Sequence, residues 1–189
     1  MSHSADTTPS PIPGNATTAT GTTYDLFFTG KDDPRCCVVI GEDTKPVYFA
    51  FETERGVLPN VSTLVYKNNN VLCARLDWLA GNHLGSATIG SRQLLMTDLV
   101  RVSAASTNSR EFESSNGQRF EWRRCRDNPT SYDLYAIPNS RIAVFRRCQQ
   151  QTVVGPSHGL FQYAFNHEAF LLEALITLCL NRWIDLHGV

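Results

Sequence analysis

The sequence lacks a strong net charge and contains few lysines. Its 189 residues include 17 lysines and arginines against 18 aspartates and glutamates, which gives a net charge of -1 when the histidines are neutral. Only three of the basic residues are lysines, at positions 31, 45 and 67. A balanced charge produces no overall field that would attract nucleic acid or an acidic membrane. We therefore expect no nucleic-acid partner, and any anionic partner must bind a local patch.

Metal-binding and catalytic motifs are also missing. The six cysteines form no C-x2-C pair and no Cys/His cluster that would place four ligands around zinc. No nucleophile elbow, glycine-rich phosphate loop or HExxH motif accompanies the histidines. His83, His158 or His167 could act as a base and Cys73 or Cys148 as a nucleophile only if the fold brought such a pair together. We expect no metal, no cofactor, no catalytic residues and no enzymatic activity.

The first 23 residues contain almost no large apolar side chain. They are mainly Ser, Thr, Pro, Ala and Gly, and such a composition cannot bury enough surface to offset the entropy of ordering. We expect residues 1–23 to be a disordered tail and residues 24–189 to form a single domain. Because this segment has no apolar core typical of a secretory signal, we expect a cytoplasmic protein with reduced thiols, which could lie at the periphery of a membrane.

Short β-branched and aromatic runs separated by turn residues follow the tail. Turns are indicated at Asp32-Asp33-Pro34, at residues 68–70 and at Asn116-Gly117, and nearly every connection is short, which favours antiparallel strands. The pattern predicts about twelve strands, at residues 24–29, 35–40, 46–52, 61–67, 71–79, 86–89, 93–103, 110–114, 118–125, 132–137, 141–147 and 160–165.

One hairpin can be predicted to the residue. A two-residue turn at Asn116-Gly117 would place apolar residues opposite charged ones on both faces of the hairpin. A three-residue loop that begins at Ser115 instead pairs Phe112 with Phe120, Ser114 with Gln118 and Arg110 with Trp122, with Gly117 in the left-handed conformation. We expect Phe112, Phe120 and Trp122 to share one buried face.

The chain closes with an apolar helix, NHEAFLLEALITLCLNRWIDLHGV. Asn166 is a suitable N-cap and Gly188 a suitable C-terminal stop, so we expect a helix over about residues 167–186. Its apolar run is too short for a bilayer, which needs about 20 residues, and the sequence predicts no transmembrane segment. A helix that is apolar almost all round must then be enclosed by protein. The predicted fold is mainly β, a closed antiparallel barrel of about twelve strands around a central, buried C-terminal helix.

A narrow polar stripe runs along this helix. Glu173, Thr177 and Asn181 recur at a spacing of four residues and so share one side. The stripe could line a ligand channel inside the barrel. Alternatively, Glu173 pairs with an inward arginine or reaches the barrel mouth.

Several segments together resemble a known group of families. They are LFFTGKDDPRCCVVIGEDTKPVYFAFETE, CARLDW, EFESSNGQRFEWRR and LYAIPNSRIAVFRR, followed by the apolar helix. This order resembles a fungal family of uncharacterised domains related to the tubby-like and LURP-one-like barrels, a plan shared with phospholipid scramblases. The resemblance implies a twelve-stranded barrel around a C-terminal helix. Tubby-like domains bind phosphoinositide head groups, but their lysine-containing site has no counterpart in this chain.

Arginines concentrate in one part of the chain. Residues 119–147 contain seven arginines and three acidic residues, a local charge of +4 against -5 for the rest. If the strands that carry Arg123, Arg124, Arg146 and Arg147 lie side by side, these arginines could bind phosphate through bidentate hydrogen bonds. Alternatively, they form a solvated surface and pair with the acids around them.

Two functions remain open at this point. The first is a non-catalytic domain that binds anionic phospholipid head groups or phosphate through the arginine patch. The second is a protein-interaction or scaffold domain that is regulated by its disordered N-terminal tail.

Overall fold

The computed structural model describes residues 22–189 except 56–60, 69, 105 and 153–154. Almost all of the tail expected at residues 1–23 therefore lies outside the described residues. The described residues form short strands, two 3-10 helices and one α-helix, in this order: β1 (Tyr24–Phe28), β2 (Cys37–Gly41), β3 (Tyr48–Arg55), β4 (Val61–Lys67), β5 (Val71–Trp78), η1 (Ala80–Asn82), β6 (Ser86–Ile89), β7 (Arg92–Leu95), η2 (Met96–Leu99), β8 (Arg101–Ser103), β9 (Ser106–Glu113), β10 (Arg119–Arg124), β11 (Tyr132–Ala136), β12 (Ser140–Arg146), β13 (Gln150–Thr152), β14 (Gly155–Ser157), β15 (Gly159–Tyr163) and α1 (Glu168–His187).

The strands form one large antiparallel sheet. Thirteen strands pair in the order β7-β6-β5-β4-β3-β2-β1-β15-β12-β11-β10-β9-β8, and β13 and β14 form a separate two-stranded sheet. The mainly β, antiparallel prediction is confirmed. The single strand expected at residues 93–103 is divided, because Met96 and Leu99 turn inward on η2 and are buried there.

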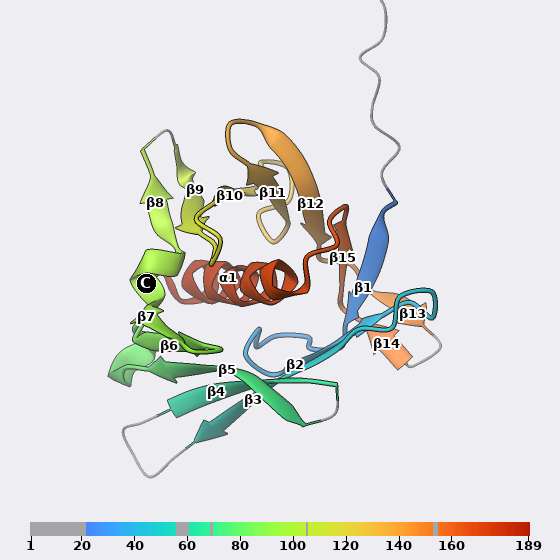
Figure 1. Ribbon diagram of the computed structural model, residues 1–189, viewed down its shortest axis with the longest axis horizontal. Coiled ribbons are helices and arrows are strands. Elements are labelled where there is room, and N and C mark those ends of the chain that lie inside the picture. Colours follow the sequence, from blue (N-terminus) through green and yellow to red (C-terminus); the bar gives the residue numbers. More distant parts are fainter. Residues whose placement is uncertain (1–21, 56–60, 69, 105, 153–154) are drawn as a thin grey trace, which may run out of the picture.

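The sheet curls around α1, which lies in the middle of the molecule (Figure 1). The two edge strands, β7 and β8, are joined by η2, which contacts both β7 and the helix. No β7–β8 ladder occurs among the described strands, so their hydrogen bonds do not close the ring that we expected. The reason is local: the chain between the edges forms a 3-10 turn instead of extended backbone.

Helix α1 is enclosed, as its composition predicted. All residues from Phe170 to Ile184 are buried except Leu172, which is half-buried. Gly188 ends the helix at φ +67°, but the N-cap differs from our expectation. The His167 ring accepts a hydrogen bond from the Phe170 amide at 3.2 Å, whereas the Asn166 side chain accepts from the Lys45 ammonium at 2.8 Å.

The β9–β10 hairpin has the predicted register. Phe112 lies opposite Phe120 and Arg110 opposite Trp122, and Gly117 has φ +80°. The aromatic face is buried, and the Phe120 ring lies 4.1 Å from the Phe170 ring of α1. The hairpin therefore packs directly on the helix, and each such aromatic contributes about 1.5–3 kcal/mol through burial.

Candidate functional site

The four predicted arginines do not lie on neighbouring strands. Strand β11 separates β10, which carries Arg123 and Arg124, from β12, which ends at Arg146 and is followed by Arg147. The condition for one patch over two adjacent strands is therefore not met. Instead, the four side chains divide into two pairs with different surroundings.

Arg123 and Arg146 belong to ion pairs on the outside of the sheet. The Arg123 guanidinium lies 2.6 Å from Glu121 and stacks over the Tyr135 ring at 3.9 Å. The Arg146 guanidinium lies 2.6 Å from Asp133. Arg123 and Arg146 therefore pair with nearby acids, which is the second of the two arrangements predicted from the sequence.

Arg124 and Arg147 meet in a small pocket at the C-terminal end of α1. We call it the arginine pocket; its volume is about 210 Å³. The third cation in its lining is Arg182, from the last part of the helix. The described residues that line it are Arg124, Pro129, Thr130, Tyr132, Arg147, Arg182, Asp185 and Leu186.

Among the described residues of this lining, Asp185 is the only acid, and its carboxylate is already bound. Its oxygens accept from Arg110 at 2.8 Å and from the Tyr132 hydroxyl at 2.6 Å, and Arg124 lies 3.4 Å away. Burial and the hydrogen bond to Asp185 raise the pKa of Tyr132, so its phenol stays a donor. Asp185 thus holds Arg124 at the wall of the pocket and binds Arg110 behind it.

Arg147 is held mainly by a backbone carbonyl. Its Nη2 donates to the Lys31 carbonyl oxygen at 2.6 Å and lies 3.5 Å from the Asp32 carboxylate. The carbonyl carries no full charge, and the contact to Asp32 is long for a charge-assisted hydrogen bond. The charge of Arg147 is therefore only weakly matched.

Arg182 is the most unusual side chain of the pocket. It is 6% exposed, and its guanidinium lies 5.0 Å from the Phe145 ring centre. Within the described part of the chain, no hydrogen bond or ion pair to the guanidinium of Arg182 is present. Burial lowers the pKa of Arg182, but a guanidinium remains protonated in proteins. The helix therefore carries a buried, unmatched positive charge into the pocket.

The charges around the pocket do not cancel. Four arginines, including Arg110 behind Asp185, face two carboxylates, which leaves an excess of positive charge. Our sequence reasoning named Arg124 and Arg147 but not Arg182. The signal for Arg182 was present, because it is the only cation within the apolar part of the helix.

The polar stripe of α1 contacts strands, and its three residues do not line the arginine pocket. Glu173 Oε1 accepts from Arg92 and from the Ser115 amide, both at 2.9 Å, and Oε2 has no partner among the described residues. The alternative in which Glu173 pairs with an inward arginine is the one that the structure shows.

The other two stripe residues fasten the helix to the β9–β10 hairpin. The Thr177 hydroxyl accepts from the Trp122 indole at 2.9 Å, and the side-chain amide oxygen of Asn181 accepts from Arg110 at 3.1 Å. Because the stripe faces strands near both sheet edges, it attaches α1 where no β7–β8 ladder is formed.

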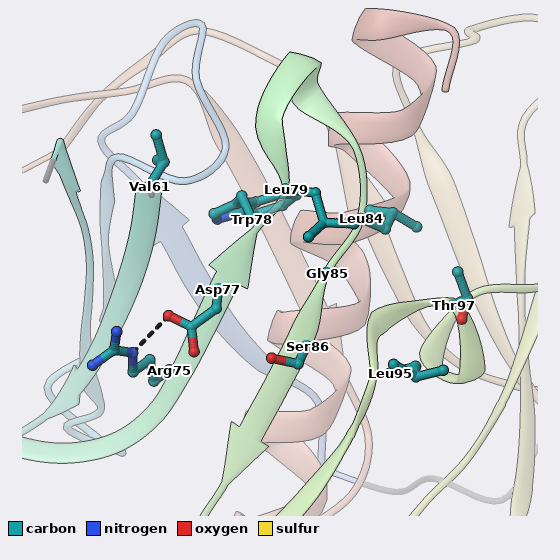
Figure 2. Close-up of a pocket in the computed structure, with 10 residues that line it drawn as sticks. All are labelled: Val61, Arg75, Asp77, Trp78, Leu79, Leu84, Gly85, Ser86, Leu95 and Thr97. Carbon is teal, nitrogen blue, oxygen red and sulfur yellow. Dashed lines mark hydrogen bonds and ion pairs between the residues drawn. The ribbon is translucent and has the colours of Figure 1, made fainter. Parts of the chain in front are cut away.

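A second cavity, of about 560 Å³, lies beside strands β5, β6 and β7; we call it the Trp78 groove (Figure 2). The Arg75–Asp77 ion pair of 2.7 Å lies on one side of it and Leu95 and Thr97 on the other. Since Asp77 and Arg75 match each other, the groove offers no free charge. Its lining is Val61, Arg75, Asp77, Trp78, Leu79, Leu84, Gly85, Ser86, Leu95 and Thr97.

Of the candidate nucleophiles and bases named from the sequence, Cys73 and His167 have hydrogen-bond partners of another kind. Burial raises the pKa of Cys73 to about 11, and its thiol donates to the Val65 carbonyl. The His167 ring caps the helix. No hydrogen bond joins a cysteine to a histidine among the described residues, and no group of three potential metal ligands occurs in that part of the chain.

Within the described residues, no helix is both long and apolar enough to cross a membrane. Comparison of the chain with family models, curated proteins and solved structures found no match.

Proposed function

We propose that this protein is a non-catalytic domain that binds a phosphate-bearing anion, free or as a phospholipid head group, in the arginine pocket. The observation that carries the proposal is Arg182, a buried guanidinium without an anionic partner among the described residues, beside Arg124 and Arg147. An unmatched buried charge is costly, and an anion that enters the pocket removes that cost.

The chemistry of the pocket suits phosphate. Guanidinium groups present planar pairs of N–H donors that match phosphate oxygens, and three of them line the pocket. Pockets for drug-sized ligands occupy about 300–1,000 Å³. A volume of about 210 Å³ is smaller and favours a single phosphate group or a compact head group over a large ligand.

The location of the pocket supports a role at the mouth of a barrel. We propose that η2 completes the wall between β7 and β8, so that the sheet acts as the closed barrel of the tubby-like and LURP-one-like plan. The pocket then opens where α1 reaches one end of that barrel. A cytoplasmic protein at the periphery of a membrane would have this end available for head groups.

Replacement of Arg182 tests the proposal. We expect Arg182→Met to weaken binding of inorganic phosphate at least about tenfold, because a buried charge-assisted contact is lost. The free energy of unfolding should be unchanged or slightly higher, since methionine removes an unmatched buried charge. Isothermal titration calorimetry and urea unfolding measure the two effects. Arg141→Met, at an exposed arginine outside the pocket, is the control and should bind like wild type.

The outcome that rejects the proposal is equal phosphate affinity in wild type and Arg182→Met, or no binding by the wild type. A charge reversal at the rim, Arg124→Glu combined with Arg147→Glu, should also abolish binding. Added salt should weaken wild-type binding, because exposed charges are screened.

The second candidate function is that of a protein-interaction or scaffold domain. The observation that favours it is the Trp78 groove, whose rim carries Leu79 and Leu95 at 60% and 58% exposure. The tail that would regulate such an interaction lies outside the described residues. This candidate is preferred if phosphate does not bind and if deletion of residues 1–23 abolishes a specific protein interaction.

A further inference from the structure

Another pocket, distinct from the Trp78 groove, adjoins the arginine pocket. It has a volume of about 360 Å³ and shares Leu186 with the arginine pocket. We call it the Asp32 pocket, because Asp32 is its most exposed acid, with a side chain that is 80% exposed. Its lining is Asp32, Asp33, Arg35, Trp183, Leu186 and His187.

The two aspartates of this pocket differ in how they are matched. Asp33 binds the Arg35 guanidinium through both oxygens, at 3.0 and 2.8 Å. Burial alone would raise the pKa of Asp33, but the hydrogen bonds and charge of Arg35 lower it. The same guanidinium stacks on the Trp183 ring at 3.4 Å, so Arg35 is held in place. Asp33 and Arg35 therefore balance each other, and Arg35 does not neutralise Asp32.

Asp32 depends on the arginine pocket for its counter-charge. The contact that the structure shows for its carboxylate is the one to Arg147, at 3.5 Å. A phosphate that binds Arg147 and Arg182 would compete for this arginine. It would also lie within about 6 Å of the Asp32 carboxylate, if its oxygen approaches the guanidinium to about 2.8 Å. At that distance the two anions share the single charge of Arg147, which cannot neutralise both of them, so they repel each other.

We propose that the ligand is a phosphate ester that carries its own ammonium group, of the phosphoethanolamine or phosphocholine type. This inference rests on the proposed function. The phosphate occupies the arginine pocket on Arg124, Arg147 and Arg182. The ammonium group lies beside the Asp32 carboxylate. The distance from the arginine pocket to Asp32 suits the two-carbon linker of these compounds. The ammonium then neutralises Asp32 in place of Arg147, which binds the phosphate.

Titration calorimetry with the full chain tests the inference. The probes are phosphoethanolamine and ethyl phosphate, which differ by the ammonium group, at about pH 8, where both phosphates are fully ionised. Wild type should bind phosphoethanolamine about fivefold more tightly, the upper end of what an exposed charge pair contributes. Asp32→Asn should remove this preference and bind ethyl phosphate more tightly than wild type does. Asp43→Asn, at an exposed aspartate of the β2–β3 turn, should keep the preference.

The possible results separate the two proposals. Equal affinity of wild type for the two probes, or a preference that survives Asp32→Asn, overturns the ammonium inference and leaves phosphate binding intact. No binding of either probe overturns both proposals. Vesicles of phosphatidylethanolamine then identify the source: binding to them that Asp32→Asn weakens assigns a lipid head group, whereas binding of the soluble probe alone assigns a free ester.

Discussion

Truncation of the chain before Asn166 is expected to leave an insoluble or molten product. Helix α1 lies in the middle of the curled sheet, and nearly all of its residues from Phe170 to Ile184 are buried. Each large apolar side chain contributes about 1.5–3 kcal/mol through burial, and a domain of this kind has only about 5–15 kcal/mol of net stability. Expression of residues 1–165, followed by near-UV circular dichroism and thermal unfolding, measures the effect.

A single substitution gives a milder form of the same experiment. Leu175→Asp places a carboxylate at a position that is 1% exposed, and it should abolish cooperative unfolding. Leu186→Asp makes the same change on the same helix at a position that is 52% exposed, and it should cost about 1 kcal/mol or less. A soluble 1–165 fragment that unfolds cooperatively would contradict the central role of the helix.

Gly85→Ala is expected to destabilise the protein by about 3 kcal/mol, the upper part of the range for overpacking. A Cβ atom at Gly85 would lie 2.0 Å from the backbone oxygen of Asp77, which cannot move without shifting β5. The carbonyl of Gly85 also accepts from the Met96 amide at 2.9 Å. Displacement of this residue would therefore disturb β5, β6 and η2 together. Urea unfolding, followed by tryptophan fluorescence, measures the loss.

The matched control is Gly90→Ala. A Cβ atom at Gly90 meets no atom within 4 Å, so only its backbone conformation, with φ +58°, opposes the substitution. A left-handed alanine costs about 1–2 kcal/mol, and the control should fall within that range. If the two alanine variants lost equal stability, the close approach of Gly85 to Asp77 would not be the cause.

Local sequence patterns were sufficient for two elements of this fold. The register of the β9–β10 hairpin followed from Asn116-Gly117 and from the positions of Phe112, Phe120 and Trp122, because a turn and its flanking strands are neighbours in the chain. The enclosed helix followed from an apolar circumference together with a length that is too short for a bilayer. Its N-cap was wrong by one residue, because Lys45 binds the Asn166 side chain and leaves the capping position to His167.

The candidate site depended on contacts that no local pattern contains. Asp185, which lines the arginine pocket, and Arg110, which binds it from behind, lie 75 residues apart in the sequence. The sequence could not show that Arg123 and Arg146 would find acids on their own or neighbouring strands while Arg182 would not. Whether a charge is matched is decided by the side chains that surround it, and these come from distant segments.

The sequence alone thus determined the antiparallel class, one hairpin register and a buried C-terminal helix, since these follow from side-chain periodicity and turn chemistry over short distances. Tertiary structure alone decided the order of the strands and the 3-10 turn between β7 and β8. It also decided which of the arginines meet in one pocket. The physical reason is that strand order and charge pairing are set by long-range packing, where many alternatives share the same local pattern.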